Sequence, residues 1–160
     1  MPLERVAIIG AGAWGSALAQ AAAAAGRRVT LVARDAVLAA EINATHRNRR
    51  YLGELALSPA IVAASSLPPA DIVILAVPAQ ASRAALDTLG AAVLAGKPVV
   101  LSAKGLEHAT LERQSEILAE LAPDALPYVL SGPSFAEDVA AGRPTAVTLA
   151  GDDAEATDAI

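Results

Sequence analysis

The sequence predicts a doubly wound α/β fold. Apolar segments of strand length alternate with helical segments along the 160 residues. The later strand-like segments, such as 71–77 (DIVILAV), are continuous apolar runs, which are typical of parallel strands covered on both faces. A glycine fingerprint also joins the first strand to the first helix. Together these observations predict a Rossmann-type, mostly parallel sheet with helices on both faces.

Taken in order, strands are expected near 5–9, 28–32, 61–63, 72–77, 98–102, 127–130 and 145–150, and helices near 15–25, 36–43, 79–90, 110–121 and 134–141. The first strand is a short apolar run that ends at Gly10. Helix formers continue from Ser16 to Ala25, and Gly26 is a stop signal. The β-branched residues from Val29 onward predict the second strand. The one long irregular segment is expected at about 44–60.

Length and composition limit the classes of protein. A chain of 160 residues predicts one domain, assigned to 1–150. Alanine makes up nearly half of its apolar content of 54%. Apolar runs are broken well before the roughly 18 residues of a membrane span, and the start lacks a secretory leader. Net charge −5 disfavours nucleic-acid binding. Without cysteine there is no disulfide or thiolate site, so we expect a cytoplasmic setting and no metal.

The end of the sequence carries a separate signal. Gly151-Asp152-Asp153 should form a turn and cap a new helix, which has barely two turns before Ile160. We therefore expect 151–160 to be the truncated start of a helix that follows the domain.

The glycine fingerprint Gly10-Ala-Gly12-Ala-Trp-Gly15 predicts a dinucleotide site. Gly10 permits the tight turn, Gly12 lets the backbone approach a pyrophosphate, and Gly15 lets the helix pack closely on the sheet. The alternative is a purely structural turn in a chain rich in alanine and glycine.

Ligands of such sheets bind outside the carboxyl ends of the strands. By this rule Lys104, which follows the strand at 98–102, should point into the crevice, whereas Lys97 precedes that strand. The alternative for Lys104 is a surface lysine beside a turn glycine. In the segment 130–137 (LSGPSFAE), Ser131 or Ser134 could cap the next helix, with Phe135 in the core.

The residues after the second strand bear on cofactor choice. An acid here binds the ribose of NAD, and an arginine can bind the 2′-phosphate of NADP. If Ala33 ends the strand, Arg34 faces the adenosine and Asp35 becomes the N-cap of the following helix. This arrangement favours NADP over NAD. The basic residues at 46–50 are either a solvated loop or a phosphate contact.

Four ordered motifs together resemble bacterial NAD(P)-dependent glycerol-3-phosphate dehydrogenase over essentially the whole chain. They are 10–19 (GAGAWGSALA), 48–52 (NRRYL), 102–107 (SAKGLE) and 131–137 (SGPSFAE) followed by 141–145 (AGRPT). The resemblance implies an enzyme that interconverts sn-glycerol 3-phosphate and dihydroxyacetone phosphate by hydride transfer, for glycerophospholipid synthesis. It also allows a homodimer of the full-length enzyme.

The resemblance assigns the binding residues as well. It implies that the cofactor contacts Gly10, Gly12, Ala13, Trp14, Gly15, Arg34, Tyr51, Lys104, Gly132, Ser134 and Ala136, and that Lys104 also binds substrate. The family commonly has serine at the position of Ala13 and Pro-Gly at Gly53-Glu54, which leaves the conformation of that loop open. The catalytic base of the family is a lysine of a C-terminal helical domain, so no catalytic residue is expected here.

Two other functions fit part of the pattern. Another two-domain reductase, of the β-hydroxyacid or ketopantoate type, would share the glycine loop and an arginine after the second strand. The 102–107 and 131–137 motifs argue against it. A nucleotide-sensing module without catalysis is the second alternative.

Overall fold

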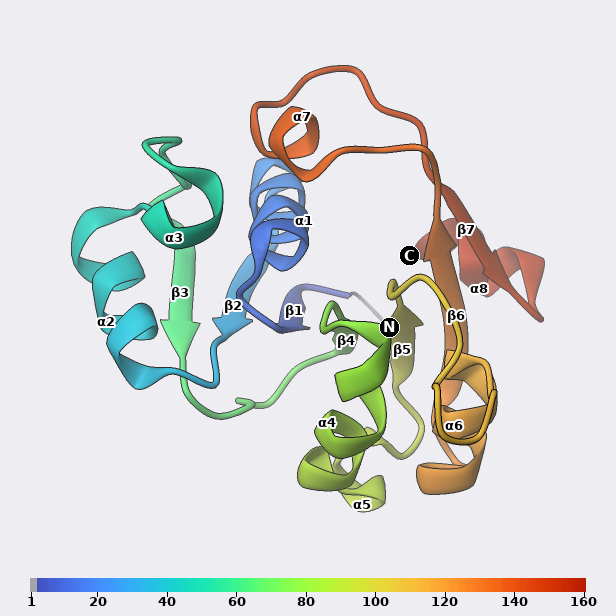
Figure 1. Cartoon of the computed structure of the whole chain (residues 1–160). Coiled ribbons are helices and arrows are strands. Elements are labelled where there is room, and N and C mark those ends of the chain that lie inside the picture. The colour runs from blue at the N-terminus through green and yellow to red at the C-terminus, as the bar shows by residue number, and fades with distance from the viewer. Residues whose placement is uncertain (1–2) are drawn as a thin grey trace.

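The computed structural model describes residues 3–160 and contains one seven-stranded sheet in the order β3-β2-β1-β4-β5-β6-β7 (Figure 1). The strands are β1 (Arg5–Ile9), β2 (Arg28–Val32), β3 (Ile61–Ala64), β4 (Ile72–Leu75), β5 (Pro98–Leu101), β6 (Leu126–Ser131) and β7 (Thr148–Gly151). The first six pair in parallel, and β7 pairs antiparallel to β6. The predicted fold class is confirmed.

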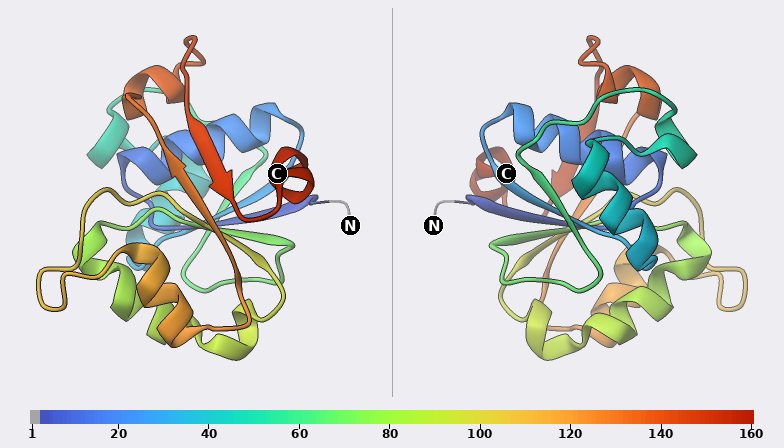
Figure 2. Two further views of the ribbon diagram at one scale, coloured as in Figure 1. Left: turned by 90° about the vertical axis from the view of Figure 1, so that its right-hand side faces the viewer. Right: turned by 90° about the vertical axis from the view of Figure 1, so that its left-hand side faces the viewer.

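The helices connect the strands across both faces of the sheet. They are α1 (Ala13–Ala24), α2 (Ala36–Thr45), α3 (Arg49–Leu52), the 3₁₀ turn η1 (Ala79–Ala81), α4 (Ser82–Leu89), α5 (Ala91–Leu94), α6 (Gln114–Leu121), α7 (Ala136–Ala140) and α8 (Ala154–Ala159). Figure 2 shows α1 and α7 on one side of the sheet and α4, α5 and α6 on the other.

Each face of the sheet has its own apolar core. In β1, Ile8 contributes to the core beneath α1 and α2, and Ile9 contributes to the core beneath α4 and α6. This alternation follows from the two-residue period of a strand. Because helices cover both faces, the central strands are apolar throughout, as the sequence predicted.

Several predicted boundaries are wrong. The segment 44–60, expected to be irregular, contains the end of α2 and the short helix α3. The helix expected to begin near 110 begins at Gln114, because residues 102–113 form a loop held by side-chain hydrogen bonds. The helix expected at 79–90 is divided into η1 and α4 and ends at Gly90, whose φ is +80°.

Two expected caps have different outcomes. Asp153 caps α8 by accepting a hydrogen bond from the backbone N–H of Ala156, as predicted, although Gly151 belongs to β7. Neither serine caps α7: Ser131 ends β6, and the Ser134 hydroxyl donates to the carbonyl of Ala146. Phe135, the N-cap residue, is 75% exposed rather than in the core. Ser134 does not cap α7 because its hydroxyl is used in the hydrogen bond to Ala146, just before β7.

Candidate functional site

The loops that follow the parallel strands lie at the same edge of the sheet. Strand β1 lies between β2 and β4. The helices after β1 and β2 pack on one face of the sheet, and the helix after β4 packs on the other. The boundary between β1 and β4 is therefore a topological switch point, where ligands bind in doubly wound sheets. The segments after β1, β2, β5 and β6 carry, respectively, Gly10, Arg34, Lys104 and Gly132. The structure thus brings the main predicted binding segments to one edge.

Two glycines of the fingerprint are required by backbone and packing. Gly10 has φ +109°, and a Cβ there would lie 2.9 Å from the carbonyl oxygen of Ala76 after β4. A Cβ on Gly15 would lie 1.8 Å from the carbonyl oxygen of Gly10, so only glycine lets α1 approach the end of β1.

Gly12 differs from both. Its φ of −78° and ψ of −175° suit any residue, and it is the N-cap of α1 without a side-chain hydrogen bond. A Cβ on Gly12 would have no atom of the other described residues within 4 Å, apart from its two chain neighbours. The backbone and the packing therefore do not require glycine here. The missing side chain instead leaves room directly before the first amides of α1, where helices bind phosphate groups.

A buried asparagine that the sequence reasoning missed holds the glycine loop. The Asn48 side chain is fully buried and its Nδ2 donates to the carbonyl oxygen of Ala11 at 2.9 Å and to the Ser16 hydroxyl at 2.8 Å. Asn48 precedes α3, so this helix is fastened to the loop between β1 and α1. Its place in the NRRYL motif was the available signal, but spacing alone could not show which side chain turns inward.

The first turn of α1 and the α3 segment carry other predicted contacts. Ala13 and Trp14 are partly buried and pack against the core beneath α1. Tyr51 of α3 is 42% exposed, and the Arg50 guanidinium lies 5.3 Å from its ring centre. Gly53 is the C-cap residue of α3 and has φ +59°.

The residues after β2 adopt the predicted arrangement. The Asp35 carboxylate accepts hydrogen bonds from the backbone N–H groups of Val37 and Leu38 and so caps α2. Arg34 is exposed beyond the end of β2. The carboxylate is therefore committed to the helix, and the guanidinium remains accessible at the edge of the switch point.

Lys104 reaches the loop that follows the neighbouring strand. Its ammonium donates to the carbonyl oxygen of Gly132 at 2.9 Å. A Cβ on Gly132 would lie 2.8 Å from the carbonyl oxygen of Ala146, so glycine here has a packing reason. Ala136 begins α7, which packs on α1. Lys97 lies at the opposite end of β5, where its ammonium donates to the carbonyl oxygen of Val93.

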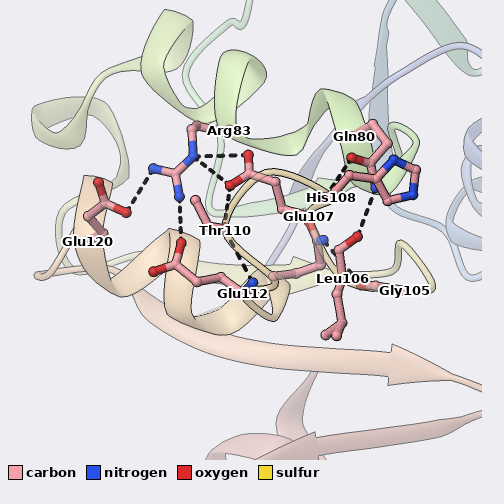
Figure 3. A network of polar contacts seen from close by, with 10 residues as sticks. Gln80, Arg83, Gly105, Leu106, Glu107, His108, Thr110, Glu112 and Glu120 are labelled. Carbon is pink, nitrogen blue, oxygen red and sulfur yellow. Dashed lines mark hydrogen bonds and ion pairs between the residues drawn. The ribbon is translucent and has the colours of Figure 1, made fainter.

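An ionic cluster holds the loop that carries Lys104 (Figure 3). Arg83 of α4 donates to Glu107 and Glu112 of this loop and to Glu120 of α6. Hydrogen bonds to Glu120 and then to Glu107 raise the pKa of Arg83. The Thr110 hydroxyl and then Arg83 lower the pKa of Glu107, against the opposing effect of its burial. Arg83 and Glu107 therefore carry opposite charges at neutral pH.

A surface hollow, a metal site and a membrane span are other functional features that the described residues could have. A hollow of about 300 Å³ lies at the entering ends of β1 and β2, beside Arg5 and Arg28, on the opposite edge of the sheet. Residues 3–160 hold no cluster of three acidic or histidine side chains suited to a metal ion. Within the same range no helix has both the length and the apolarity of a membrane span.

The comparisons with known proteins agree with this geometry. The family described as NAD-dependent glycerol-3-phosphate dehydrogenase N-terminus matches residues 5–157. The chain belongs to this family. A glycerol-3-phosphate dehydrogenase [NAD(P)+] from Parvibaculum lavamentivorans is 48% identical over 98% of this chain and 48% of its own length. The chain spans about half the length of the curated relatives it matches.

Solved structures place the fold in the same family. Glycerol-3-phosphate dehydrogenase from Coxiella burnetii superimposes with a TM-score of 0.87 at 29% identity, over 97% of this chain and 49% of that one. A probable 2-dehydropantoate 2-reductase from Bacillus subtilis reaches 0.61 at 18% identity, over 81% of this chain and 41% of that one. The reductase likeness extends to the fold alone, so the first alternative lacks the support that the dehydrogenase family has.

Proposed function

We propose that this chain binds NADP or NAD, with NADP favoured, as the cofactor-binding half of an oxidoreductase acting on sn-glycerol 3-phosphate and dihydroxyacetone phosphate. In this proposal residues 1–150 form the NAD(P)-binding domain, and the nicotinamide, when bound, supplies or accepts the hydride. Family membership supports the cofactor class and the reaction class.

The open space at Gly12 is the observation that carries the proposal. Gly10 and Gly15 are glycines for reasons internal to the fold, whereas Gly12 is not. The first amides of α1 lack partners within the helix and point out of its N-terminus. A pyrophosphate placed there would accept their hydrogen bonds and interact favourably with the helix dipole.

Arg34 supports the choice of NADP. Because Asp35 is turned into α2, no carboxylate from that position competes for the ribose hydroxyl. An exposed guanidinium can pair with a 2′-phosphate through two parallel hydrogen bonds. Trp14 of α1 and the exposed Tyr51 of α3 are proposed as apolar surfaces for the cofactor.

Lys104 is proposed to contact both cofactor and substrate. Its ammonium lies between the ends of β5 and β6 and can exchange the Gly132 carbonyl for a substrate oxygen or phosphate. It would orient the substrate and stabilise negative charge. The base that removes the hydroxyl proton must lie within hydrogen-bond reach of that proton. We assign this base to the other half of the full-length enzyme, which the family resemblance describes as helical.

The cellular part of the proposal follows the family. We infer a cytoplasmic enzyme that supplies the glycerol phosphate backbone of phospholipids, with a homodimer as the assembly to test. Residues 151–160 would then lead from the cofactor domain toward the substrate domain.

A titration tests this proposal directly. NADH and NADPH are added separately to the 160-residue chain, with and without dihydroxyacetone phosphate, and binding is followed by nicotinamide fluorescence. We expect both cofactors to bind, NADPH more tightly, and no turnover of glycerol 3-phosphate. Failure of both cofactors to bind a folded chain would reject the proposed site, and robust turnover would reject the assignment of the base.

A further inference from the structure

The loop that carries Lys104 lacks the usual sources of order. Residues 102–113 contain no helix or strand, and their large apolar side chains point outward: Leu106 is 47% exposed and Leu111 is 70% exposed. Gly105 and Leu111 also have positive φ values. A loop of this length without buried apolar side chains has to be ordered by polar contacts.

Arg83 provides the central contact. Its Nε lies 3.0 Å from both carboxylate oxygens of Glu107, and its two terminal nitrogens reach Glu112 at 2.6 Å and Glu120 at 2.7 Å. Glu107 is only 7% exposed, although it is a carboxylate in a surface loop. The planar guanidinium thus joins the middle of the loop, at Glu107, and its C-terminal part, at Glu112, to helices α4 and α6 (Figure 3).

Gln80 fastens the same loop at a second point. Its amide nitrogen donates to the carbonyl oxygen of Leu106 at 2.8 Å, and its amide oxygen accepts from the backbone N–H of His108 at 2.9 Å. These bonds hold the residues immediately before and after Glu107. Gln80 belongs to η1, directly after the β4 end at the switch point.

We propose that Arg83 and Gln80 are positioning residues that fix the 102–113 loop so that Lys104 is presented beside Gly132. A partly buried ion pair adds little net stability compared with apolar packing, but the Arg83–Glu107 pair can fix where the loop lies. Only two residues, Gly105 and Leu106, separate Lys104 from Glu107, so the lysine backbone has little freedom once Glu107 is held. This inference rests on the proposed function, because it assigns Arg83 and Gln80 an effect on ligand binding through Lys104.

A double-mutant cycle in the 160-residue chain tests the inference. NADPH affinity is measured for the parent chain, Lys104→Ala, Arg83→Met and the double variant. We expect Lys104→Ala to weaken binding about tenfold and Arg83→Met about threefold or more, with the double variant no weaker than Lys104→Ala. Additive losses, or an unchanged affinity for either single variant, would overturn the proposal.

A second variant separates positioning from folding. Arg83→Met leaves Glu107 buried without its charged partner, which lowers the free energy of unfolding of the variant. Gln80→Leu removes two hydrogen bonds without leaving a buried charge, and it should show the same coupling to Lys104. Hydrogen exchange of backbone amides in 103–112 should rise in both variants; unchanged exchange would contradict the proposal.

Arg113→Met is the matched control. Arg113 is the N-cap residue of α6, and its exposed side chain pairs with Glu116 in the first turn of that same helix. We expect this variant to retain parent affinity and loop exchange, and a loss equal to that of Arg83→Met would overturn the inference. If the parent chain itself binds no NADPH, the proposed function fails; if it binds and the cycle is additive, only the positioning role fails.

Discussion

Substitution of Gly12 by alanine tests whether the open space before α1 is a pyrophosphate site. Apart from the two chain neighbours of Gly12, the added Cβ meets no atom of the described residues within 4 Å, and the backbone angles of Gly12 suit alanine. Alanine is a poorer N-cap than glycine, at a cost of up to about 1 kcal/mol, and it reduces the entropy of the unfolded chain by a similar free energy. The free energy of unfolding should therefore change by less than about 1 kcal/mol.

Binding should respond strongly to the same substitution. A methyl group at Gly12 would push the pyrophosphate away from the first amides of α1. The loss of one or two charge-assisted hydrogen bonds, at about 1.5–3 kcal/mol each, weakens NADPH binding by roughly tenfold to more than ten-thousandfold. Gly12→Val should abolish detectable binding.

Gly15→Ala is the matched control for Gly12→Ala. Its Cβ would lie 1.8 Å from the carbonyl oxygen of Gly10, so the fold must shift, at a cost of about 1–3 kcal/mol or more. Urea unfolding and fluorescence titration of both variants separate the two effects. Parent affinity in a folded Gly12→Val chain would refute the site, and a large loss of stability in Gly12→Ala would refute the interpretation of the open space.

Four further changes have expected outcomes. Arg34→Ala should weaken NADPH binding about tenfold to a hundredfold and leave NADH affinity unchanged in parallel titrations. An equal loss for both cofactors would mean that another residue contacts the 2′ position of the ribose. Asp35→Ala should lower the free energy of unfolding by about 1 kcal/mol in urea by removing the α2 cap, and an unchanged urea midpoint would contradict that role. The hydrogen bond from the Arg5 side chain lowers the pKa of Asp71 to about 2, from an ordinary value of 3.8. Because the folded-state pKa is the lower one, Asp71 stabilises the fold above about pH 4, and this stabilisation is lost as pH falls toward 2. In Asp71→Asn the free energy of unfolding, measured in urea at several pH values, should depend less on pH between about 4 and 2. An unchanged pH dependence would contradict the assignment. In the full-length enzyme, Lys104→Ala should lower kcat/KM roughly a hundredfold or more and Lys97→Ala should be nearly silent, so steady-state rates that show the reverse would move the substrate site.

The sequence by itself determined the fold class and the position of the glycine turn after β1. Apolar runs such as Ile72–Leu75 identify strands covered on both faces, because only parallel strands between helices tolerate apolar side chains in both directions. The glycine spacing located the turn after β1. The strand-end rule placed Lys104 and Lys97 at opposite ends of β5, and the Arg34-Asp35 order correctly predicted the α2 cap.

The tertiary structure decided the contacts between segments far apart in the sequence. Asn48 reaches Ala11 and Ser16 across more than 30 residues, and Arg83 reaches Glu107 across 24. Local patterns carry no information on such pairings, which depend on how the helices pack on the sheet. For the same reason the sequence predicted a helix near 110, where long-range hydrogen bonds hold a loop, and a cap at Ser134, whose hydroxyl bonds Ala146 instead. The distinction between Gly12 and its two neighbouring glycines also required the fold, because only the packed structure shows which positions have no room for a Cβ.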